Sequence, residues 1–283
     1  MKGRLAQLAH AGHISWLSYY FAEFIARRAQ TDIDSVVALS AALVSEASRS
    51  GDVCVDLEVY AGNSWFAAAA EDSTGLTPAA GEWRKILNDS TCVGNRDPLT
   101  LDGGRLYLNR YWRYESEVAG QLLTRSESLS TQALPSTRPS DSTGDADQNA
   151  AVTMATDRRF CVISGGPGSG KTSTVIRILA DLLEGEPAMR ISLAAPTGRA
   201  AARMMESIQR GLQRLDASFA HRDLIPQTAS TIHRLLGYRR SGFDHGRDHP
   251  LALDCVVVDE ASMIDLQLMY HLLDALPGHA RLI

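Results

Sequence analysis

Residues 165–172, GGPGSGKT, have the types and spacing of a loop that binds phosphate. The segment fits the pattern G-x-x-x-x-G-K-[ST] and lies between two apolar stretches, 161–163 and 173–179. The sequence therefore predicts a strand, a glycine loop and a helix in that order, the context in which this pattern binds a nucleotide. Glycines let backbone N–H groups turn toward an anion, and the helix adds the positive end of its dipole.

Two side chains of this loop are suited to the chemistry of a nucleoside triphosphate. Lys171 would place its charge between the β- and γ-phosphates, and the Thr172 hydroxyl would ligate Mg²⁺. The residues expected to contact the nucleotide are Gly165, Gly166, Pro167, Gly168, Ser169, Gly170, Lys171, Thr172 and Ser173. For the loop alone, the alternative is a glycine-rich turn between a strand and a helix.

An acidic pair ends the apolar segment VVVDE at 256–260 and supplies the second half of such a site. We expect Asp259 to hold Mg²⁺ and Glu260 to orient and deprotonate the water that attacks the γ-phosphate. Alone, this pattern is often a strand end that runs into a cap. At ~90 residues after a phosphate loop it favours a nucleotide hydrolase, with Lys171, Asp259 and Glu260 as the catalytic residues.

Two further polar segments follow apolar ones, APTGRAAAR at 195–203 and ASTIHRLL at 229–236. Thr197 is suited to cap a helix whose first N–H groups face an anion, and Arg199 to contact a phosphate. An ordinary capped helix explains the first segment equally well. In the second segment Ser230 or Thr231 would cap, and a single histidine such as His233 is more often structural than catalytic.

Strands and helices alternate in the second half of the chain, which predicts an α/β fold with a parallel sheet. The expected strands are 160–164, 190–195 and 253–258, and the expected helices are 171–184, 198–215 and 266–275. Ligands in such folds bind beyond the carboxyl ends of the strands. Residues 280–283 resemble the start of another buried strand. Because termini normally lie in exposed segments, we expect the chain to be a fragment.

The first half is predicted to be a small, mostly helical domain. Residues 1–28 have the pattern of one amphipathic helix rather than of a signal peptide, which favours a cytoplasmic protein. A helix at 35–47, strands at 53–57 and 105–108, and a helix at 111–123 follow. Residues 126–147 are rich in Ser, Thr, Pro, Gly and Asp and predict a flexible linker. The expected domains are therefore 1–125 and 148–283.

Charge and cysteine content exclude some functions. Residues 1–150 carry 13 basic and 19 acidic side chains, whereas 151–283 carry 15 and 14. The first half is therefore a poor nucleic-acid surface and a plausible protein-binding one. The four cysteines have no C-x-x-C spacing, which argues against a zinc site or a disulfide framework, and Cys161 and Cys255 are expected in the core. No run of about 18 apolar residues predicts a membrane span.

Together these segments resemble motifs I, Ia, Ic and II of superfamily 1 DNA helicases. The similarity is strongest to the RecD family, the alpha subunits of exodeoxyribonuclease V (RecBCD), over residues ~148–283. It is weaker in the first half, at residues 106–112, LYLNRYW. The resemblance implies a RecA-like P-loop NTPase domain that uses ATP and Mg²⁺. It also implies an ATP-dependent 5′→3′ helicase subunit that acts on double-strand DNA ends in recombinational repair.

The resemblance also implies contacts that the residues alone do not specify. Gln148 would contact adenine, Thr197 and Arg199 would lie along single-stranded DNA, and so would Thr231 and His233. The partners would be RecB and RecC, with the N-terminal domain docked on RecC and no membrane involved.

Motif III and the second RecA-like domain of the family, which carries an arginine finger, are not found in residues 1–283. We therefore expect these residues to bind nucleotide but to hydrolyse it poorly. A stand-alone or relaxase-associated helicase, and a P-loop ATPase switch that does not translocate, are the alternatives.

Overall fold

The computed structural model describes residues 4–66, 75–127, 146–166, 168–213 and 221–283. The chain divides into two compact units, residues 1–116 and 117–283, each with its own hydrophobic core. The boundary falls within helix α6 (Asn109–Ser126). Pro167 and most of the expected linker 126–147 lie outside the described residues, so the predicted domain limits stay a prediction.

The first unit combines helices with a small antiparallel sheet. Its elements are α1 (Arg4–His10), α2 (Trp16–Ala29), α3 (Val36–Arg49), β1 (Cys54–Asp56), α4 (Leu57–Tyr60), α5 (Ala80–Asn88), β2 (Leu99–Asp102) and β3 (Arg105–Leu108). The strands are ordered β1-β3-β2. Trp83 is fully buried in the core and donates its indole N–H to the Ser40 hydroxyl at 2.7 Å. The prediction of a mostly helical first half is confirmed.

The prediction of one helix over residues 1–28 is wrong. Two helices form instead, because Gly12 has a φ of +78° and the Ser15 hydroxyl accepts a hydrogen bond from the Ser18 N–H. A left-handed glycine followed by a serine cap ends one helix and begins the next.

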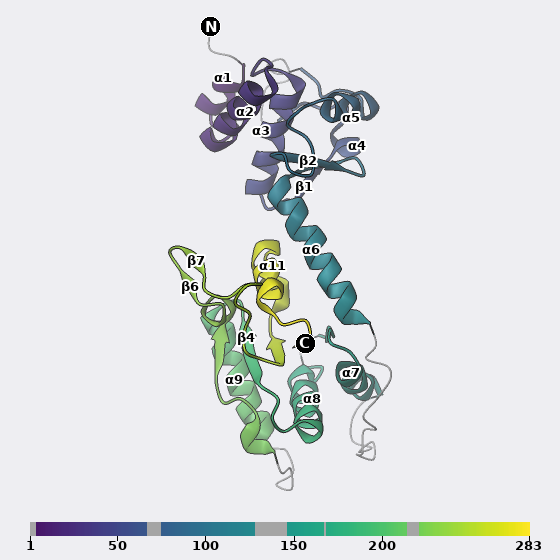
Figure 1. The fold of residues 1–283 in the computed structure, drawn as a ribbon, viewed down its shortest axis with the longest axis vertical. Helices are drawn as coiled ribbons and strands as arrows, with labels where there is room; N and C mark the ends of the chain where they lie inside the picture. Colours follow the sequence, from purple (N-terminus) through teal and green to yellow (C-terminus); the bar gives the residue numbers. More distant parts are fainter. Residues whose placement is uncertain (1–3, 67–74, 128–145, 167, 214–220) are drawn as a thin grey trace. The chain divides into compact units, whose positions relative to one another are not determined.

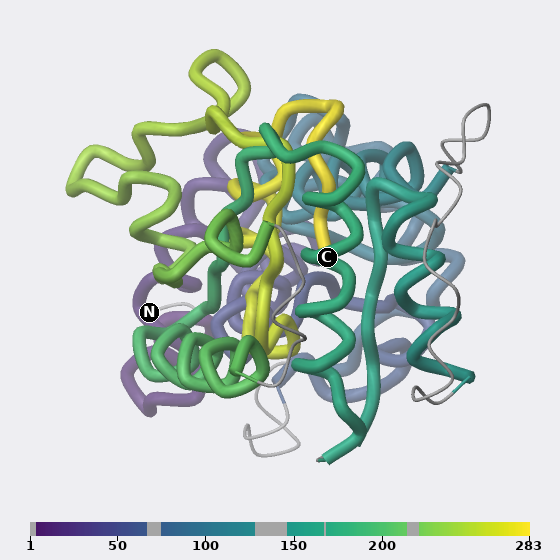
Figure 2. The backbone as a smooth tube through the Cα atoms, turned by 90° about the horizontal axis from the view of Figure 1, so that it is seen from below, coloured from purple at the N-terminus to yellow at the C-terminus, as the bar shows by residue number. Residues whose placement is uncertain are grey.

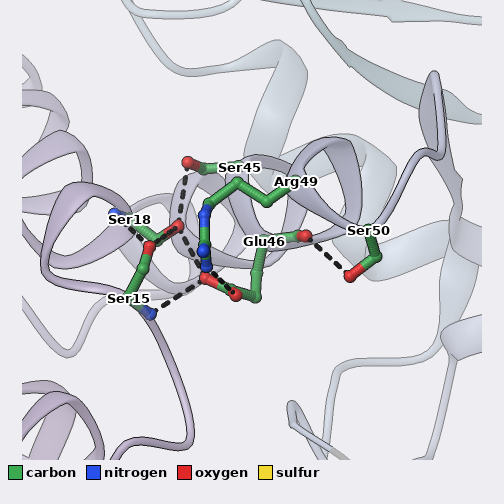
Figure 3. A network of polar contacts seen from close by, with 6 residues as sticks. All are labelled: Ser15, Ser18, Ser45, Glu46, Arg49 and Ser50. Atoms are coloured by element: carbon green, nitrogen blue, oxygen red, sulfur yellow. Dashed lines mark hydrogen bonds and ion pairs between the residues drawn. The ribbon is translucent and has the colours of Figure 1, made fainter.

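Helices α2 and α3 are joined by a polar network around Glu46 (Figure 3). One carboxylate oxygen accepts from the Ser15 N–H at 3.0 Å and from the Ser18 hydroxyl at 2.9 Å, and the other accepts from Arg49 at 2.6 Å. Burial opposes ionisation, but these hydrogen bonds and the charge of Arg49 outweigh it, so the pKa of Glu46 lies below its usual value. The network therefore favours a charged Glu46 and fixes how α2 packs on α3.

The second unit is built on a parallel sheet with the strand order β5-β4-β8-β9. Its helices are α7 (Ala146–Asp157), α8 (Lys171–Gly185), α9 (Gly198–Leu212), η1 (Arg222–Leu224), α10 (Ile232–Leu235), η2 (Ala261–Met263) and α11 (Leu266–Ala275). Its strands are β4 (Ile191–Ala195), β5 (Ala229–Thr231), β6 (Tyr238–Arg239), β7 (Gly242–Phe243), β8 (Cys255–Val258) and β9 (Arg281–Leu282). Figure 1 labels β4 of this sheet and the helices α8, α9 and α11 of the same unit. The predicted α/β fold with a parallel sheet is confirmed.

One predicted strand of this unit, 160–164, does not form. Phe160 makes a single parallel bridge to Leu282, and the backbone then leaves the sheet. Two hydrogen bonds hold this bridge: the Cys161 N–H donates to the Leu282 oxygen at 3.1 Å, and the Leu282 N–H donates to the Arg159 oxygen at 2.7 Å. The other predicted strands of this unit agree with β4, β8 and β9 to within two residues, whereas β5, β6 and β7 were not predicted. Cys161 and Cys255 are buried in the core as expected.

A buried arginine ties the end of α6 to the end of α11 within this unit. Arg125 is 4% exposed and donates to the backbone oxygens of Leu276 and Pro277 at 3.1 and 3.2 Å. These carbonyls follow the last residue of α11, where the helix dipole is negative. The carbonyls at this helix end therefore partner the buried positive charge. Burial lowers the pKa of Arg125, and the nearby positive charge of Arg159 lowers it further.

In the described part of the chain, no helix combines the length and the apolar character that a membrane span requires.

Candidate nucleotide-binding site

The sheet brings the glycine loop and the acidic pair to one edge. The segment before the loop runs parallel to β9 at the Phe160–Leu282 bridge, and β9 runs parallel to β8. Both segments therefore leave the sheet at the carboxyl ends of its strands, where open parallel sheets bind ligands. The loop follows one segment, and Asp259 follows the other.

Glycine is required at several positions of the loop. Gly168 and Gly170 have φ values of +79° and +80°, which residues with a Cβ seldom adopt. A Cβ on Gly165 would lie 2.5 Å from the Ser169 hydroxyl oxygen, and one on Gly170 would lie 2.7 Å from the Gln148 side-chain nitrogen. Side chains at these positions would fill the space of a phosphate cradle, so the residues present fit a bound triphosphate.

Helix α8 begins in a way that suits an anion. Its N-cap is Gly170, which offers no side chain to the first N–H groups of the helix. Helices α9, α10 and α11 of the same unit are instead capped by the side chains of Thr197, Thr231 and Asp265. The first-turn N–H groups of Lys171, Thr172 and Ser173 therefore face the loop without a side-chain acceptor, as at phosphate sites on helix N-termini.

The cationic end of Lys171 lies over the loop. Its ammonium donates to the backbone oxygens of Gly165 and Gly166, the second at 3.0 Å. Thr172 follows on the first turn of α8 and is half-buried. A rotation of the long lysine side chain suffices to carry its charge from the carbonyls to a phosphate in the same loop.

Asp259 and Glu260 are both exposed where β8 ends. The Asp259 N–H donates to the Ala194 oxygen at 3.0 Å, and its carboxylate accepts from the Glu260 N–H at 2.9 Å. Glu260 has a φ of +56°, in the left-handed region that non-glycine residues seldom adopt. The strand therefore presents two carboxylates in a tight bend, and strained backbone of this kind is concentrated at functional sites.

Gln148 lies beside the loop, on the first turn of α7. Its side-chain N–H donates to the Ser169 oxygen at 3.3 Å. This places a carboxamide next to the candidate phosphate site, although Gln148 lies 17 residues before Gly165, the first residue of the loop.

Comparison with known proteins identifies the family. A family model described as an AAA domain matches residues 148–283, and one described as the N-terminal domain of RecBCD enzyme subunit RecD matches residues 10–107. The chain is 40% identical over 258 residues to RecBCD enzyme subunit RecD of Mycolicibacterium smegmatis, a match that covers 88% of this chain and 45% of that protein. This chain belongs to the RecD family.

Other relatives agree. The RecBCD enzyme subunit RecD of Haemophilus influenzae is 33% identical over 94% of this chain and 47% of its own length. The ATP-dependent RecD2 DNA helicase of Deinococcus radiodurans is 34% identical over 71% of this chain and 26% of its own length. This RecD-family chain thus spans less than half the length of these curated relatives. The P-loop NTPase fold of its second unit agrees with the matching AAA domain.

The residues expected along DNA lie at the same edge of the sheet in this RecD-family chain. Ala195 and Thr231 are register partners in β4 and β5, so Thr197 comes just after β4 and Thr231 ends the neighbouring β5. Each threonine oxygen accepts a backbone N–H, from Ala200 and Arg234 respectively, at 3.2 Å. The capping roles are confirmed, and the hydroxyl hydrogens stay available to donate to a phosphate. Arg199 and His233 are exposed.

Two features of the RecD-family chain escaped the sequence interpretation. The short hairpin β6–β7 places the rings of Tyr238 and Phe243 at 5.5 and 5.9 Å from the ring of His233. The Ser-Gly pair at 241–242 is the feature of the sequence that could have predicted the turn of this hairpin. Asn149 accepts from Arg177 at 2.6 Å across α7 and α8, a contact with no local sequence signal.

Proposed function

We propose that this chain carries the ATP site of a 5′→3′ DNA helicase subunit that acts on double-strand DNA ends as part of a RecBCD-type complex. The observation that supports this most is the arrangement at one edge of the sheet. The glycine loop, the start of α8 without a side-chain cap, and two exposed carboxylates lie there together. Relatives named as RecBCD subunits and as an ATP-dependent DNA helicase support the substrate and the reaction.

In this proposal the loop amides of 165–170 and the first turn of α8 bind the phosphates of ATP. Lys171 contacts the β- and γ-phosphates, and Thr172 and Asp259 hold Mg²⁺, Asp259 through water. Mg²⁺ would neutralise the charge that develops on the phosphates. Glu260 orients a water and takes its proton. Gln148, whose side chain donates to the Ser169 oxygen of the loop, would contact the adenine base.

An ATP-binding measurement tests this proposal. We expect the chain to bind ATP with Mg²⁺ in isothermal titration calorimetry. Lys171→Ala should weaken binding by at least about tenfold, since hydrogen bonds to charged groups contribute about 1.5–3 kcal/mol. Arg210→Ala, an exposed charge near the far end of α9, is the control and should leave the affinity unchanged. Equal affinity of the Lys171→Ala variant would contradict the assigned site.

For DNA, the proposal is that Thr197, Arg199, Thr231 and His233 lie along one strand of single-stranded DNA. All four lie where β4 and β5 meet the first turns of α9 and α10. Binding of this kind weakens as salt rises, because phosphate contacts release counterions.

In fluorescence anisotropy with single-stranded DNA, Arg199→Ala should lower both the affinity and the salt dependence, and Arg210→Ala should change neither. An unaltered affinity for Arg199→Ala would favour a P-loop switch that does not contact DNA.

For partners, we propose that an exposed apolar face of α2 contacts another subunit. Its side chains are Trp16, Leu17, Tyr20 and Phe24, with exposed fractions of 42%, 66%, 58% and 50%. Aromatic side chains are enriched in the centres of protein interfaces. The relatives' names point to RecB and RecC as the subunits.

In a pull-down with RecB and RecC, Tyr20→Asp should reduce capture and Arg27→Asp, on the same helix, should reduce it less. No capture of the unchanged chain would favour a stand-alone helicase.

A further inference from the structure

Helix α7 carries Gln148 to the glycine loop, but little apolar packing holds it there. Only Val152 and Ala155 of its residues are buried in the core. Polar contacts must therefore contribute to its placement. Figure 2 shows α7 and α8 from a second direction, and the two helices pack against each other.

Two arginines hold α7 at its two ends. Near its start, Asn149 accepts from the Arg177 guanidinium of α8 at 2.6 Å. At its end, Arg281 of β9 donates to the backbone oxygens of Ala155 and Arg158 at 3.1 and 2.7 Å. The first contact matters more for Gln148, because Asn149 is the next residue and Arg177 belongs to the helix that begins at Lys171.

The carboxamide of Gln148 has chemistry that distinguishes one base from another. It offers one donor and one acceptor in a plane, which pair with N7 and the N6 amino group of adenine. Guanine presents two acceptors at the corresponding positions, so one of the two pairings becomes repulsive. The close approach of Gln148 to Gly170, where a Cβ would lie 2.7 Å from its nitrogen, leaves the side chain little freedom on that side.

We propose that the Asn149–Arg177 pair positions Gln148 and thereby sets the preference of this site for an adenine base over a guanine base. This inference depends on the proposed nucleotide site. Arg177 does not touch the nucleotide: it is a positioning residue that couples the base-reading side chain on α7 to the phosphate-binding helix α8. The pair aligns the carboxamide before the base arrives, which reduces the ordering that binding requires.

The test compares three probes, ATP, GTP and inorganic tripolyphosphate, each titrated calorimetrically with Mg²⁺ into the chain. Gln148→Ala should weaken ATP binding by about five- to tenfold, the value of one or two neutral hydrogen bonds, and leave tripolyphosphate unchanged. Arg177→Ala and Asn149→Ala should each reproduce this loss. Gln148→Ala combined with Arg177→Ala should bind ATP no more weakly than Gln148→Ala alone, because both changes act on one contact.

Asn149→Asp serves as the matched conservative variant. It retains the acceptor for Arg177 and should keep the ratio of ATP to GTP affinity. Thermal unfolding of each variant shows whether it folds, and tripolyphosphate binding shows whether its loop is intact.

The positioning role is overturned if Arg177→Ala leaves the ATP to GTP ratio unchanged. It is also overturned if Arg177→Ala weakens all three probes equally, or if its effect adds to that of Gln148→Ala. A failure of the proposed function gives a different result: the unchanged chain binds neither ATP nor tripolyphosphate, or Lys171→Ala binds them as well as the unchanged chain does.

Discussion

Glu260 combines a carboxylate suited to catalysis with a backbone that favours glycine. Among the described non-glycine residues, only Glu260 and Gln30 have a positive φ, of +56° and +55°, and Gln30 follows the end of α2. The Gln30 N–H donates to two carbonyls at that helix end, which gives its conformation a structural reason. For Glu260 the side chain offers the better explanation, since its carboxylate is exposed beside Asp259 at the sheet edge.

The strain at Glu260 can be measured by comparing two substitutions that both remove the carboxylate. Glu260→Gly should be more stable to urea unfolding than Glu260→Ala by about 1 kcal/mol, because only glycine adopts this φ without cost. Both should still bind ATP, since the loop supplies the phosphate contacts. Equal stability of the two variants would mean that the bend is not strained.

At the scale of single residues, the sequence alone predicted the loop and the strand end correctly for residues that lie within one motif. The conformations at Gly168 and Gly170, the ammonium of Lys171 over the loop and the exposed side chain of Asp259 agree with the predicted loop and strand end. The bend at Glu260 and the Asn149–Arg177 contact could not be predicted. They depend on the register of a parallel sheet and on residues 28 positions apart, which local patterns do not encode.

Among the elements, α2 and α3 show how a helix pair can depend on one ionised side chain (Figure 3). The Glu46 side chain is 24% exposed and accepts hydrogen bonds from Ser15 and Ser18 of the α2 start. The pKa of Glu46 is lower in the folded chain than in the unfolded chain, where it is about 4.5. Ionised Glu46 therefore stabilises this helix pair when the pH is above that unfolded pKa. That contribution is lost as the pH falls through the lower folded pKa.

The corresponding prediction concerns the stability of the first unit in acid. Glu46→Gln should lower the free energy of unfolding at pH 7, and the difference from the unchanged chain should shrink as the pH falls below about 4.5. Urea unfolding between pH 7 and pH 3, followed by tryptophan fluorescence, measures this because all four tryptophans lie in residues 1–116. Glu82→Gln, an exposed glutamate in α5, is the control. A difference that stays constant with pH would show that the charge of Glu46 does not stabilise the pair.

The junction of α6 with α11 makes a second prediction at the scale of elements. Arg125→Met keeps much of the buried volume but removes the hydrogen bonds to the carbonyls of Leu276 and Pro277. It should destabilise the second unit by about 1–3 kcal/mol, the cost of leaving buried polar groups unsatisfied. Arg203→Met, an exposed position on α9, should change stability by less than about 0.5 kcal/mol. Hydrogen exchange of amides in α11 reports on this unit, and equal exchange in both variants would contradict the assigned role.

Element types could be predicted from sequence more reliably than their limits and pairing. Periodicity identified α3, α8 and α11, whose ends carry recognisable caps at Ser35, Gly170 and Asp265. It failed at residues 1–28, where Gly12 and Ser15 divide an apolar pattern into two helices. It also failed at 160–164, where pairing depends on a partner segment far along the chain, at Leu282, rather than on these residues alone.

At the scale of the whole molecule, the two units have separate cores, and the candidate site belongs to one of them. A ligand that binds only the folded second unit stabilises that unit by mass action. Saturating ATP with Mg²⁺ should therefore slow hydrogen exchange in α8 and β8. It should leave the urea midpoint followed by tryptophan fluorescence, which reports on residues 1–116, nearly unchanged. An equal rise in both signals would show that the units unfold together.

Above all, we propose that the glycine loop and the carboxylate after β8 hold one magnesium–nucleotide complex between them. The most direct test is the calorimetric affinity for ATP with and without Mg²⁺, in the unchanged chain and in Asp259→Asn. We predict that Mg²⁺ strengthens ATP binding by about tenfold or more in the unchanged chain, corresponding to about 1.4 kcal/mol, and that Asp259→Asn loses most of this gain. The same dependence on Mg²⁺ in both proteins would contradict the account.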